Sequence, residues 1–378
     1  MMINSDQPIE IAGAGPAGLA AAITLARAGR QVIVHEARKN VGERFQGDFQ
    51  GLENWTTERD VLLDLQQSGF TTNFDALPCT SGIVFDHRDR EYRIQTAKPL
   101  FYMVERGSKE TSLDSALMTQ AQDLGVEIKF NNRISHIEGP GIMATGPRKA
   151  DAISVGYHGE TTMENGFWAI CDDRLAPKGY AYLLVWDGRA TIKTCMFRDF
   201  KKERRYVDRT VEAFRRLVGF EMFNPRPHGG AGNFRIPDRA RFGSHLEVGE
   251  QAGFQDTLWG FGMRYAMKSG ELAAKSLIEG VDYDTLWKNH FGKQLETGIT
   301  NRVLFELLGN RGYRWFISHL SGNEKLREKL FRHYQPTLIK RLLYPWARRR
   351  FKSRRNDESC NHINCSCVWC RLCAAGKN

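Results

Sequence analysis

Three glycines, spaced as Gly13-x-Gly15-x-x-Gly18, stand near the start of this 378-residue chain, directly after a short apolar run. In such a pattern the first glycine permits a tight turn, and the second lets the backbone approach a pyrophosphate. The third lets a helix pack closely on a strand. The N-terminus of that helix would offer unpaired N–H groups to an anion. We therefore expect a dinucleotide's phosphates to be bound by Gly13, Gly15, Pro16, Ala17 and Gly18.

A carboxylate stands where the second strand of the same unit should end. Residues 17–28 have an Ala/Leu-rich helical pattern, Gly29 stops it, and residues 31–36 read as a strand. Glu36 follows Gly13 by 23 residues, the separation at which an acid accepts the hydroxyls of an adenosine ribose. We expect Glu36 and its neighbour Ala37 to contact that ribose, with a free 2′-hydroxyl favoured over a 2′-phosphate.

Two later segments match secondary motifs of flavoproteins, namely residues 142–146, which end in Ala144-Thr145-Gly146, and residues 248–253. With these motifs, the chain resembles the geranylgeranyl reductase-like branch of the FAD-dependent oxidoreductases that share the aromatic-hydroxylase fold. The resemblance extends over roughly residues 9–280 and implies that the dinucleotide is FAD.

The resemblance also implies contacts to the flavin. In that family a Gly-Asp-x-x-Gly segment binds the ribityl chain through its acid, and a following Gly-x-Gly leads into a helix that faces the pyrimidine end of the ring. The matching residues here are Gly249, Glu250, Gly253, Gly260 and Gly262, where Glu250 replaces the usual aspartate. A simple turn with a helix cap is the alternative interpretation.

Two arginines fit the same resemblance. Arg44 stands where the family places an arginine beside the cofactor, and Arg106 precedes Leu113-Asp114 as in the family's R-x(n)-L-D segment. Each could equally be a surface or helix-capping arginine.

The substrate is indicated by motifs that are present and by others that are missing. The Asp-Gly fingerprint of aromatic hydroxylases does not follow Gly146, and the Trp-x-Trp-x-Ile-Pro signature of flavin-dependent halogenases is absent. Residues 177–182 resemble the aromatic segment that lines the substrate tunnel of the reductase branch, although an ordinary strand would also fit. We expect a reductase or dehydrogenase of a small hydrophobic substrate such as an isoprenoid or lipid. Because flavin itself supplies the hydride, no conspicuous catalytic side chain is expected.

The last nineteen residues contain five of the eight cysteines, with His362 among them. Such density in a reducing compartment favours a metal, either zinc or an iron–sulfur cluster, although a thiol-rich redox-active tail is the alternative. The expected ligands are Cys360, Cys365, Cys367, Cys370 and Cys373.

Residues 329–355 carry ten Lys or Arg and no acid, as many as the whole formal net charge of +10. Between 340 and 355 these cations alternate with Leu, Tyr, Trp and Phe, which suits an anionic membrane surface. A solvated basic helix end is the alternative, and no motif supports nucleic-acid binding. The absence of a signal peptide and of a long apolar run predicts a cytoplasmic protein. If the basic stretch binds a bilayer, the contact would be peripheral, on the cytoplasmic membrane face.

The elements around these motifs predict an α/β fold: a Rossmann-like FAD-binding domain, an inserted antiparallel-sheet substrate domain, a helical C-terminal region and a short Cys-rich tail. The FAD-binding parts are 1–80, 106–150 and 241–280, the substrate parts 81–105 and 151–240, the helical region 281–350 and the tail 351–378.

Other functions remain open at this point. The chain could be an electron-transfer or redox-sensing flavoprotein that uses a C-terminal metal site and a redox partner protein, or a flavin-dependent monooxygenase. No second dinucleotide fold is visible, so NAD(P)H, a ferredoxin or a quinone could supply the electrons.

Overall fold

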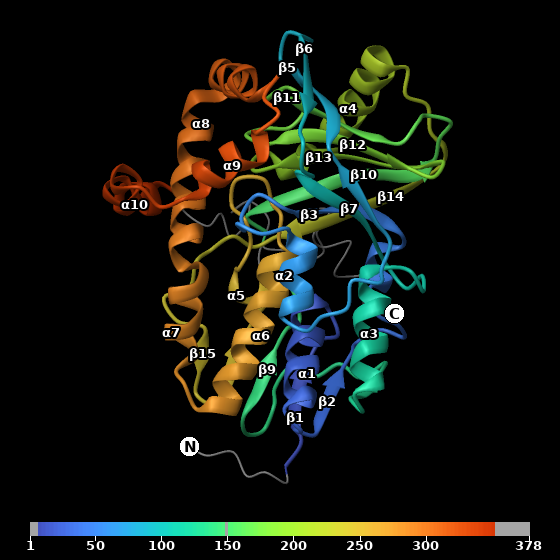
Figure 1. The fold of residues 1–378 in the computed structure, drawn as a ribbon. Coiled ribbons are helices and arrows are strands. Elements are labelled where there is room, and N and C mark those ends of the chain that lie inside the picture. Colours follow the sequence, from blue (N-terminus) through green and yellow to red (C-terminus); the bar gives the residue numbers. More distant parts are fainter. Residues whose placement is uncertain (1–6, 148–149, 352–378) are drawn as a thin grey trace.

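The computed structural model describes residues 7–147 and 150–351. Its lower part in Figure 1 is built on a six-stranded sheet in the order β15-β16-β9-β1-β2-β8. All neighbouring strands are parallel except β15, which is antiparallel to β16. The strands are β1 (Ile9–Ala12), β2 (Val32–His35), β8 (Glu127–Lys129), β9 (Gly141–Met143), β15 (Arg241–Phe242) and β16 (His245–Glu247).

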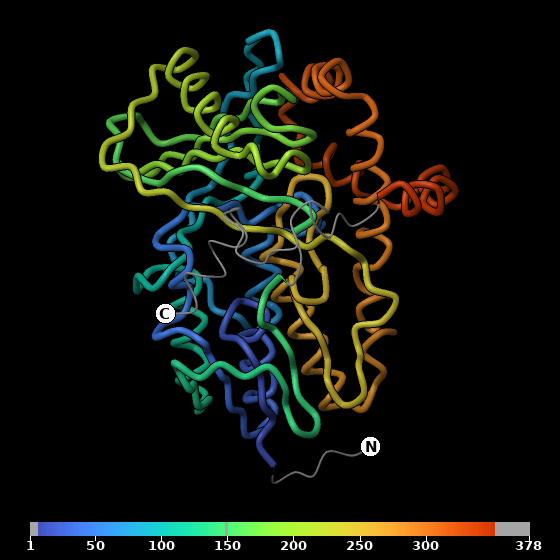
Figure 2. Tube along the Cα trace, turned by 180° about the vertical axis from the view of Figure 1, so that it is seen from behind, coloured from blue at the N-terminus to red at the C-terminus, as the bar shows by residue number. Residues whose placement is uncertain are grey.

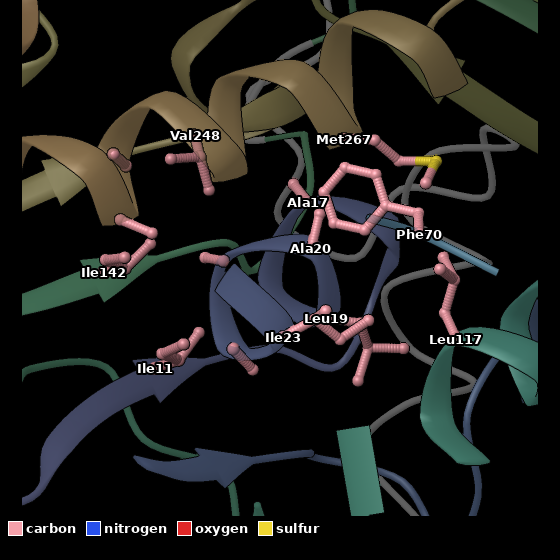
Figure 3. Packing of buried hydrophobic residues seen from close by; sticks show 14 of the residues in the cluster. Ile11, Ala17, Leu19, Ala20, Ile23, Phe70, Leu117, Ile142, Val248 and Met267 are labelled. Atoms are coloured by element: carbon pink, nitrogen blue, oxygen red, sulfur yellow. The ribbon is translucent and has the colours of Figure 1, made fainter. Parts of the chain in front are cut away.

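Helix α1 (Pro16–Arg27) is the centre of the main hydrophobic core. It packs against helices α3 (Leu113–Asp123) and α6 (Met263–Glu279), and side chains such as Ile11, Ile142 and Met267 surround it (Figure 3). Gly270 of α6 permits this close approach, since a Cβ on it would lie only 2.1 Å from the Ala17 carbonyl oxygen of α1. The helix is thereby fixed with its N-terminus at the edge of the sheet.

A seven-stranded sheet forms the upper part of the molecule (Figure 1), in the order β14-β10-β13-β12-β11-β5-β6. Helix α4 (Glu203–Val218) packs on one face of this sheet. Every pair is antiparallel except β5 with β11. The strands are β5 (Ser81–Asp86), β6 (Glu91–Gln95), β10 (Ala152–Glu160), β11 (Gly166–Cys171), β12 (Tyr180–Trp186), β13 (Arg189–Met196) and β14 (Phe223–Gly232).

A third sheet, β3-β7-β4, joins the two larger ones and was not predicted from the sequence. It consists of β3 (Asp48–Glu53), β4 (Ala76–Cys79) and β7 (Phe101–Arg106), all antiparallel. The Phe49 N–H donates to Thr191 Oγ1 of β13 at 3.1 Å, and Arg189 of β13 pairs with Glu105 of β7. These contacts fasten the seven-stranded sheet to the three-stranded one.

The C-terminal region is helical, as predicted. Helix α8 (Lys293–Leu320) runs along one side of both parts and has non-helical geometry at Gly309. Helix α10 (Leu338–Arg350) projects sideways in both views (Figure 1; Figure 2). No helix in residues 7–147 or 150–351 has the length and apolarity that crossing a bilayer requires. Two short 3₁₀ helices, η1 (Glu43–Phe45) and η2 (Phe200–Lys202), and one π-helix, η3 (Lys288–Gly292), are also present. The remaining α-helices are α2 (Val61–Gln67), α5 (Gly249–Ala252), α7 (Tyr283–Trp287) and α9 (Leu326–Tyr334).

The predicted fold class is confirmed: a Rossmann-like unit, an antiparallel sheet and a helical C-terminal region are all present. Helix α4 over 203–218 and strand β12 over 180–186 lie within the predicted substrate part 151–240.

Candidate cofactor and substrate cavity

A cavity of about 1100 Å³ extends from the glycine turn to the inner face of the seven-stranded sheet. Pockets that bind one drug-sized ligand measure roughly 300–1,000 Å³, so this cavity is large enough for an elongated ligand. Fourteen of the predicted cofactor residues line it, namely Gly13, Gly15, Pro16, Ala17, Glu36, Ala37, Arg44, Arg106, Ala144, Thr145, Gly146, Glu250, Gly260 and Gly262.

The glycine turn connects β1 to α1 at one end of this cavity. Gly13 has a φ of 103°, and a Cβ on Gly18 would lie 1.9 Å from the Gly13 carbonyl oxygen, so both positions require glycine. A Cβ on Gly15 would meet nothing within 4 Å. Among the residues that the structure describes, no side chain caps the N-terminus of α1. The turn therefore leaves space and unpaired N–H groups where an anion such as pyrophosphate would bind.

Glu36 closes the turn from the end of β2. Its Oε2 accepts a hydrogen bond of 3.0 Å from the Ala14 N–H, and its Oε1 accepts one of 2.9 Å from the Arg38 N–H. The carboxylate is thus held at the cavity wall by two backbone donors, and each oxygen retains a lone pair for a ribose hydroxyl.

Arg106 lies at the cavity wall, at the end of β7. Its guanidinium makes two hydrogen bonds of 2.8 Å to the buried carboxylate of Asp114, donates to Gln50 Oε1 at 3.1 Å, and stacks on the Phe45 ring. A two-point pair of this kind fixes the guanidinium plane. The Arg-x(n)-Leu-Asp segment therefore builds a rigid cationic edge of the cavity.

Arg44 and Glu250 form an ion pair at the cavity wall, with Arg44 Nη2 3.6 Å from Glu250 Oε2. Burial raises the pKa of the Glu250 carboxyl, and Arg44 and Arg106 only partly offset this effect. The Arg44 side chain is 47% exposed and the Glu250 side chain 21%, so both remain accessible from the cavity.

The strand β9 ends beside the glycine turn. A Cβ on Gly13 would lie 2.5 Å from the Ala144 carbonyl oxygen, and Thr145 donates to Gln251 Oε1 through both its N–H and its hydroxyl, at 2.8 and 2.7 Å. The segment Ala144-Thr145-Gly146 is therefore fixed between the turn and α5.

The predicted flavin segment divides into two parts. Gly249 and Gly253 both have positive φ. A Cβ on Gly249 would meet Ala17, and a Cβ on Gly253 would meet the Arg235 backbone. Neither residue lines the cavity, so both serve packing. Gly260 and Gly262 do line it, and Gly262 precedes helix α6, whose N-terminus has no side-chain cap. Gly18, likewise, is a packing residue behind the turn.

The far end of the cavity is apolar and aromatic. On β12, Tyr180, Tyr182 and Leu184 alternate onto the inner face, and the Tyr180 hydroxyl donates to the Trp259 carbonyl at 2.5 Å. Burial raises the pKa values of both tyrosines well above the ordinary value, so their hydroxyls stay protonated. Further lining side chains come from β7, β11, α8 and α9: Phe101, Phe167, Phe316, Ile317, Leu320, Leu326 and Leu330.

Several residues at or behind the cavity wall were not predicted from the sequence. Gln50 lines the cavity and supports Arg106, and Lys193 lies on the inner face of β13. Neither belongs to a local motif. Gln251 belongs to the 248–253 segment and supports Thr145 without lining the cavity. For Lys193 the only available signal was the period-2 alternation of β13, which places it on the same face as Thr191 and Cys195.

The predicted metal ligands Cys360, Cys365, Cys367, Cys370 and Cys373 lie outside the described residues. Within residues 7–147 and 150–351, no cluster of three or more His, Cys, Asp or Glu side chains could hold a metal ion.

The chain is similar to known flavoproteins. Residues 11–54 match the family model of an NAD(P)-binding Rossmann-like domain. A digeranylgeranylglycerophospholipid reductase of Haloferax volcanii is 21% identical, over 82% of this chain and 88% of that protein. A menaquinone reductase of Mycolicibacterium smegmatis is 30% identical, over 35% of this chain and 31% of that protein.

Solved structures share the fold at low identity. A geranylgeranyl bacteriochlorophyll reductase-like protein from Thermoplasma acidophilum superposes with a TM-score of 0.67 at 15% identity, covering 93% of this chain and 97% of that one. A p-nitrophenol 4-monooxygenase from Pseudomonas putida gives 0.64 at 14% identity, covering 88% and 98%. These comparisons confirm the predicted resemblance to the geranylgeranyl reductase-like branch of the FAD-dependent oxidoreductases.

Proposed function

We propose that this chain reduces carbon–carbon double bonds of a hydrophobic, isoprenoid-type substrate with FAD as the hydride carrier. The observation that carries the proposal is the continuity of one cavity, from the cradle at Gly15 to the aromatic wall at Tyr180 and Tyr182. The names of the two reductase relatives support the same substrate class.

The residues present fit FAD. The space beside Gly15 suits a pyrophosphate, Glu36 would accept the adenosine ribose hydroxyls, and Glu250 would accept a hydroxyl of the ribityl chain. When bound, FAD supplies the hydride. The protein's own contribution is to orient the substrate and exclude water, for which the side chains of Tyr182 and Phe167 line the far end.

Two other functions stay as alternatives. The similarity in fold to a monooxygenase favours oxygen chemistry as the second candidate. An electron-transfer or redox-sensing role would rest on the Cys-rich tail, for which zinc or an iron–sulfur cluster is our proposal. Metal analysis of the full chain beside a version ending at Phe351 tests that site, and equal metal content in the two would contradict it.

We further propose that the protein is cytoplasmic and touches the membrane through α10. On that helix Leu338, Ile339 and Leu342 are 70–74% exposed and lie among Lys and Arg residues. Such a surface would let a lipid substrate pass from a bilayer to the protein.

The test uses FAD-loaded protein and an unsaturated polyprenyl lipid in detergent micelles. With NADH, NADPH, a reduced ferredoxin or a quinol as donor, mass spectrometry should detect the gain of two hydrogens per double bond without oxygen incorporation. The variant Ala169→Phe, which fills the inner face of β11, should retain FAD and lose this product. Oxygen incorporation instead would identify the monooxygenase, and protein that takes up no FAD would contradict the proposal.

A further inference from the structure

The inner face of the seven-stranded sheet carries a buried cation at the cavity. Lys193 lies on β13 with its side chain 3% exposed, and it lines the cavity together with Cys195 of the same strand. A charge in such a place is costly unless it is paired, and buried charges at clefts are concentrated in functional sites.

Two of the three ammonium N–H groups have partners. Lys193 Nζ lies 2.5 Å from Asp48 Oδ2 and 2.7 Å from His228 Nδ1. Asp48 also accepts hydrogen bonds from Gln50 Nε2 at 3.1 Å and Thr191 Oγ1 at 3.2 Å. Burial raises the pKa of the Asp48 carboxyl, but Lys193 brings the net pKa below the ordinary value, so the pair is ionic.

His228 fixes the second N–H as a neutral acceptor. Burial, reinforced by the Lys193 ammonium, lowers the pKa of His228 to about 4. Its Nε2 lies 3.1 Å from the Arg44 carbonyl oxygen, which can only accept, so Nε2 carries the proton and Nδ1 accepts from Lys193. The ammonium is therefore held in one orientation.

The third N–H of Lys193 has no partner among the described residues. Because Lys193 lines the cavity, a bound molecule could supply that partner. Other polar groups lie beside it, since Cys195 Sγ is 3.3 Å from Ser154 Oγ, which is 3.5 Å from the Tyr182 hydroxyl. We propose that Lys193 is a ligand-binding residue, whose third N–H donates to an electron-rich oxygen of a molecule in the cavity. That oxygen belongs either to the cofactor or to the phosphate of an anionic isoprenoid. The proposal rests on the proposed function.

The test removes the charge pair as a whole. Lys193→Met alone would leave Asp48 buried without its cation, so the decisive variant is K193M/D48N. The matched control is R189M/E105Q, which removes a second ion pair that also joins β13 to the three-stranded sheet, with N···O of 2.6 Å, but does not line the cavity. FAD affinity, the flavin reduction potential and binding of geranylgeranyl phosphate and uncharged geranylgeraniol are measured for each protein.

If the acceptor is a cofactor oxygen, K193M/D48N loses about tenfold in preference for reduced over oxidised FAD, a fall of about 30 mV for a two-electron couple. If the acceptor is the substrate, affinity for geranylgeranyl phosphate falls about tenfold or more, whereas that for geranylgeraniol does not. If K193M/D48N matches the control R189M/E105Q in both measurements, the proposed role of Lys193 is overturned, whereas the proposed function is not. Wild-type protein that binds neither FAD nor a prenyl probe overturns the proposed function as well.

Discussion

Glu36 Oε2 accepts a hydrogen bond of 3.0 Å from the backbone N–H of Ala14, although the two residues are 22 positions apart. This contact ties the glycine turn to the end of the second parallel strand. Because Oε1 is held by the Arg38 N–H in the same way, the carboxylate is oriented by the backbone before a ligand arrives.

We expect the substitution Glu36→Gln to weaken FAD binding by roughly 10–100-fold, because hydrogen bonds to a charged group contribute about 1.5–3 kcal/mol. The side-chain NH₂ of the introduced glutamine cannot accept a hydrogen bond, yet it would face one of the two backbone N–H donors. Titration of apoprotein with FAD measures the effect. Glu10→Gln is the control, since Glu10 lies on β1 beside His35 and does not line the cavity. Equal FAD affinity in E36Q and E10Q would contradict the assignment.

The two glycines of the turn should respond differently to alanine. At Gly18 a Cβ would lie 1.9 Å from a carbonyl oxygen, so Gly18→Ala should lower the free energy of unfolding by about 1–3 kcal/mol, as overpacking does. Gly15 has a φ of −80° and open space around its Cβ position, so Gly15→Ala should fold as stably as the wild type but bind FAD more weakly.

Urea unfolding and FAD titration separate the two glycine effects. A Gly15→Ala protein with undiminished FAD affinity would place the pyrophosphate elsewhere. A Gly18→Ala protein of wild-type stability would show that the turn accommodates the added Cβ without loss of unfolding free energy.

Local periodicity explains which elements could be predicted. Helix α4 has a strong amphipathic pattern and Gly219 at its end, and strand β12 alternates aromatic with aliphatic residues. The third sheet was missed because β3 pairs with β7 across about fifty residues. Strand β14 was missed since its sequence FNPRPHGGAG is rich in Pro and Gly, which an edge strand tolerates.

The residues of the candidate site also include some that could be predicted from the sequence and others that could not. Residues in contiguous motifs, such as Gly15 and Glu36, could be named from the sequence because the motif itself carries the geometry. The Asp48–Lys193 pair could not, since its members are 145 positions apart and each stands in an ordinary strand pattern. Gly249 and Gly253 matched a motif, yet their place in the structure shows packing rather than cavity lining.

Asp256 should make the stability depend on pH. Burial raises the pKa of Asp256 to about 7, although it accepts from the Trp259 N–H and the Tyr334 hydroxyl. Between pH 4 and 7 the folded protein therefore binds a proton that the unfolded chain releases, so stability falls as pH rises. About three pKa units at about 1.4 kcal/mol each give a loss of roughly 4 kcal/mol by pH 8.

The variant Asp256→Asn isolates this contribution, because other titrating groups cancel in the difference. Its free energy of unfolding relative to the wild type should increase from pH 5 to pH 8. A difference that stays constant over this range would mean that Asp256 ionises normally in the folded protein.

The surface of α10 combines exposed apolar side chains with cations. Ile339 and Leu342 are 70% and 72% exposed, and the helix carries five Lys or Arg and no acid. Burying each apolar side chain in a bilayer contributes about 1.5–3 kcal/mol, and each cation near an anionic surface about 1 kcal/mol.

We therefore expect the protein to sediment with vesicles rich in phosphatidylserine, less so at high salt, and I339Q/L342Q to bind at least tenfold more weakly. Leu63→Gln is the control, since Leu63 is 54% exposed on α2, which carries no Lys or Arg. Loss of binding in the control as well would indicate general hydrophobic adsorption. Wild-type protein that stays in the supernatant at low salt would show that the exposed face of α10 meets something other than an anionic bilayer.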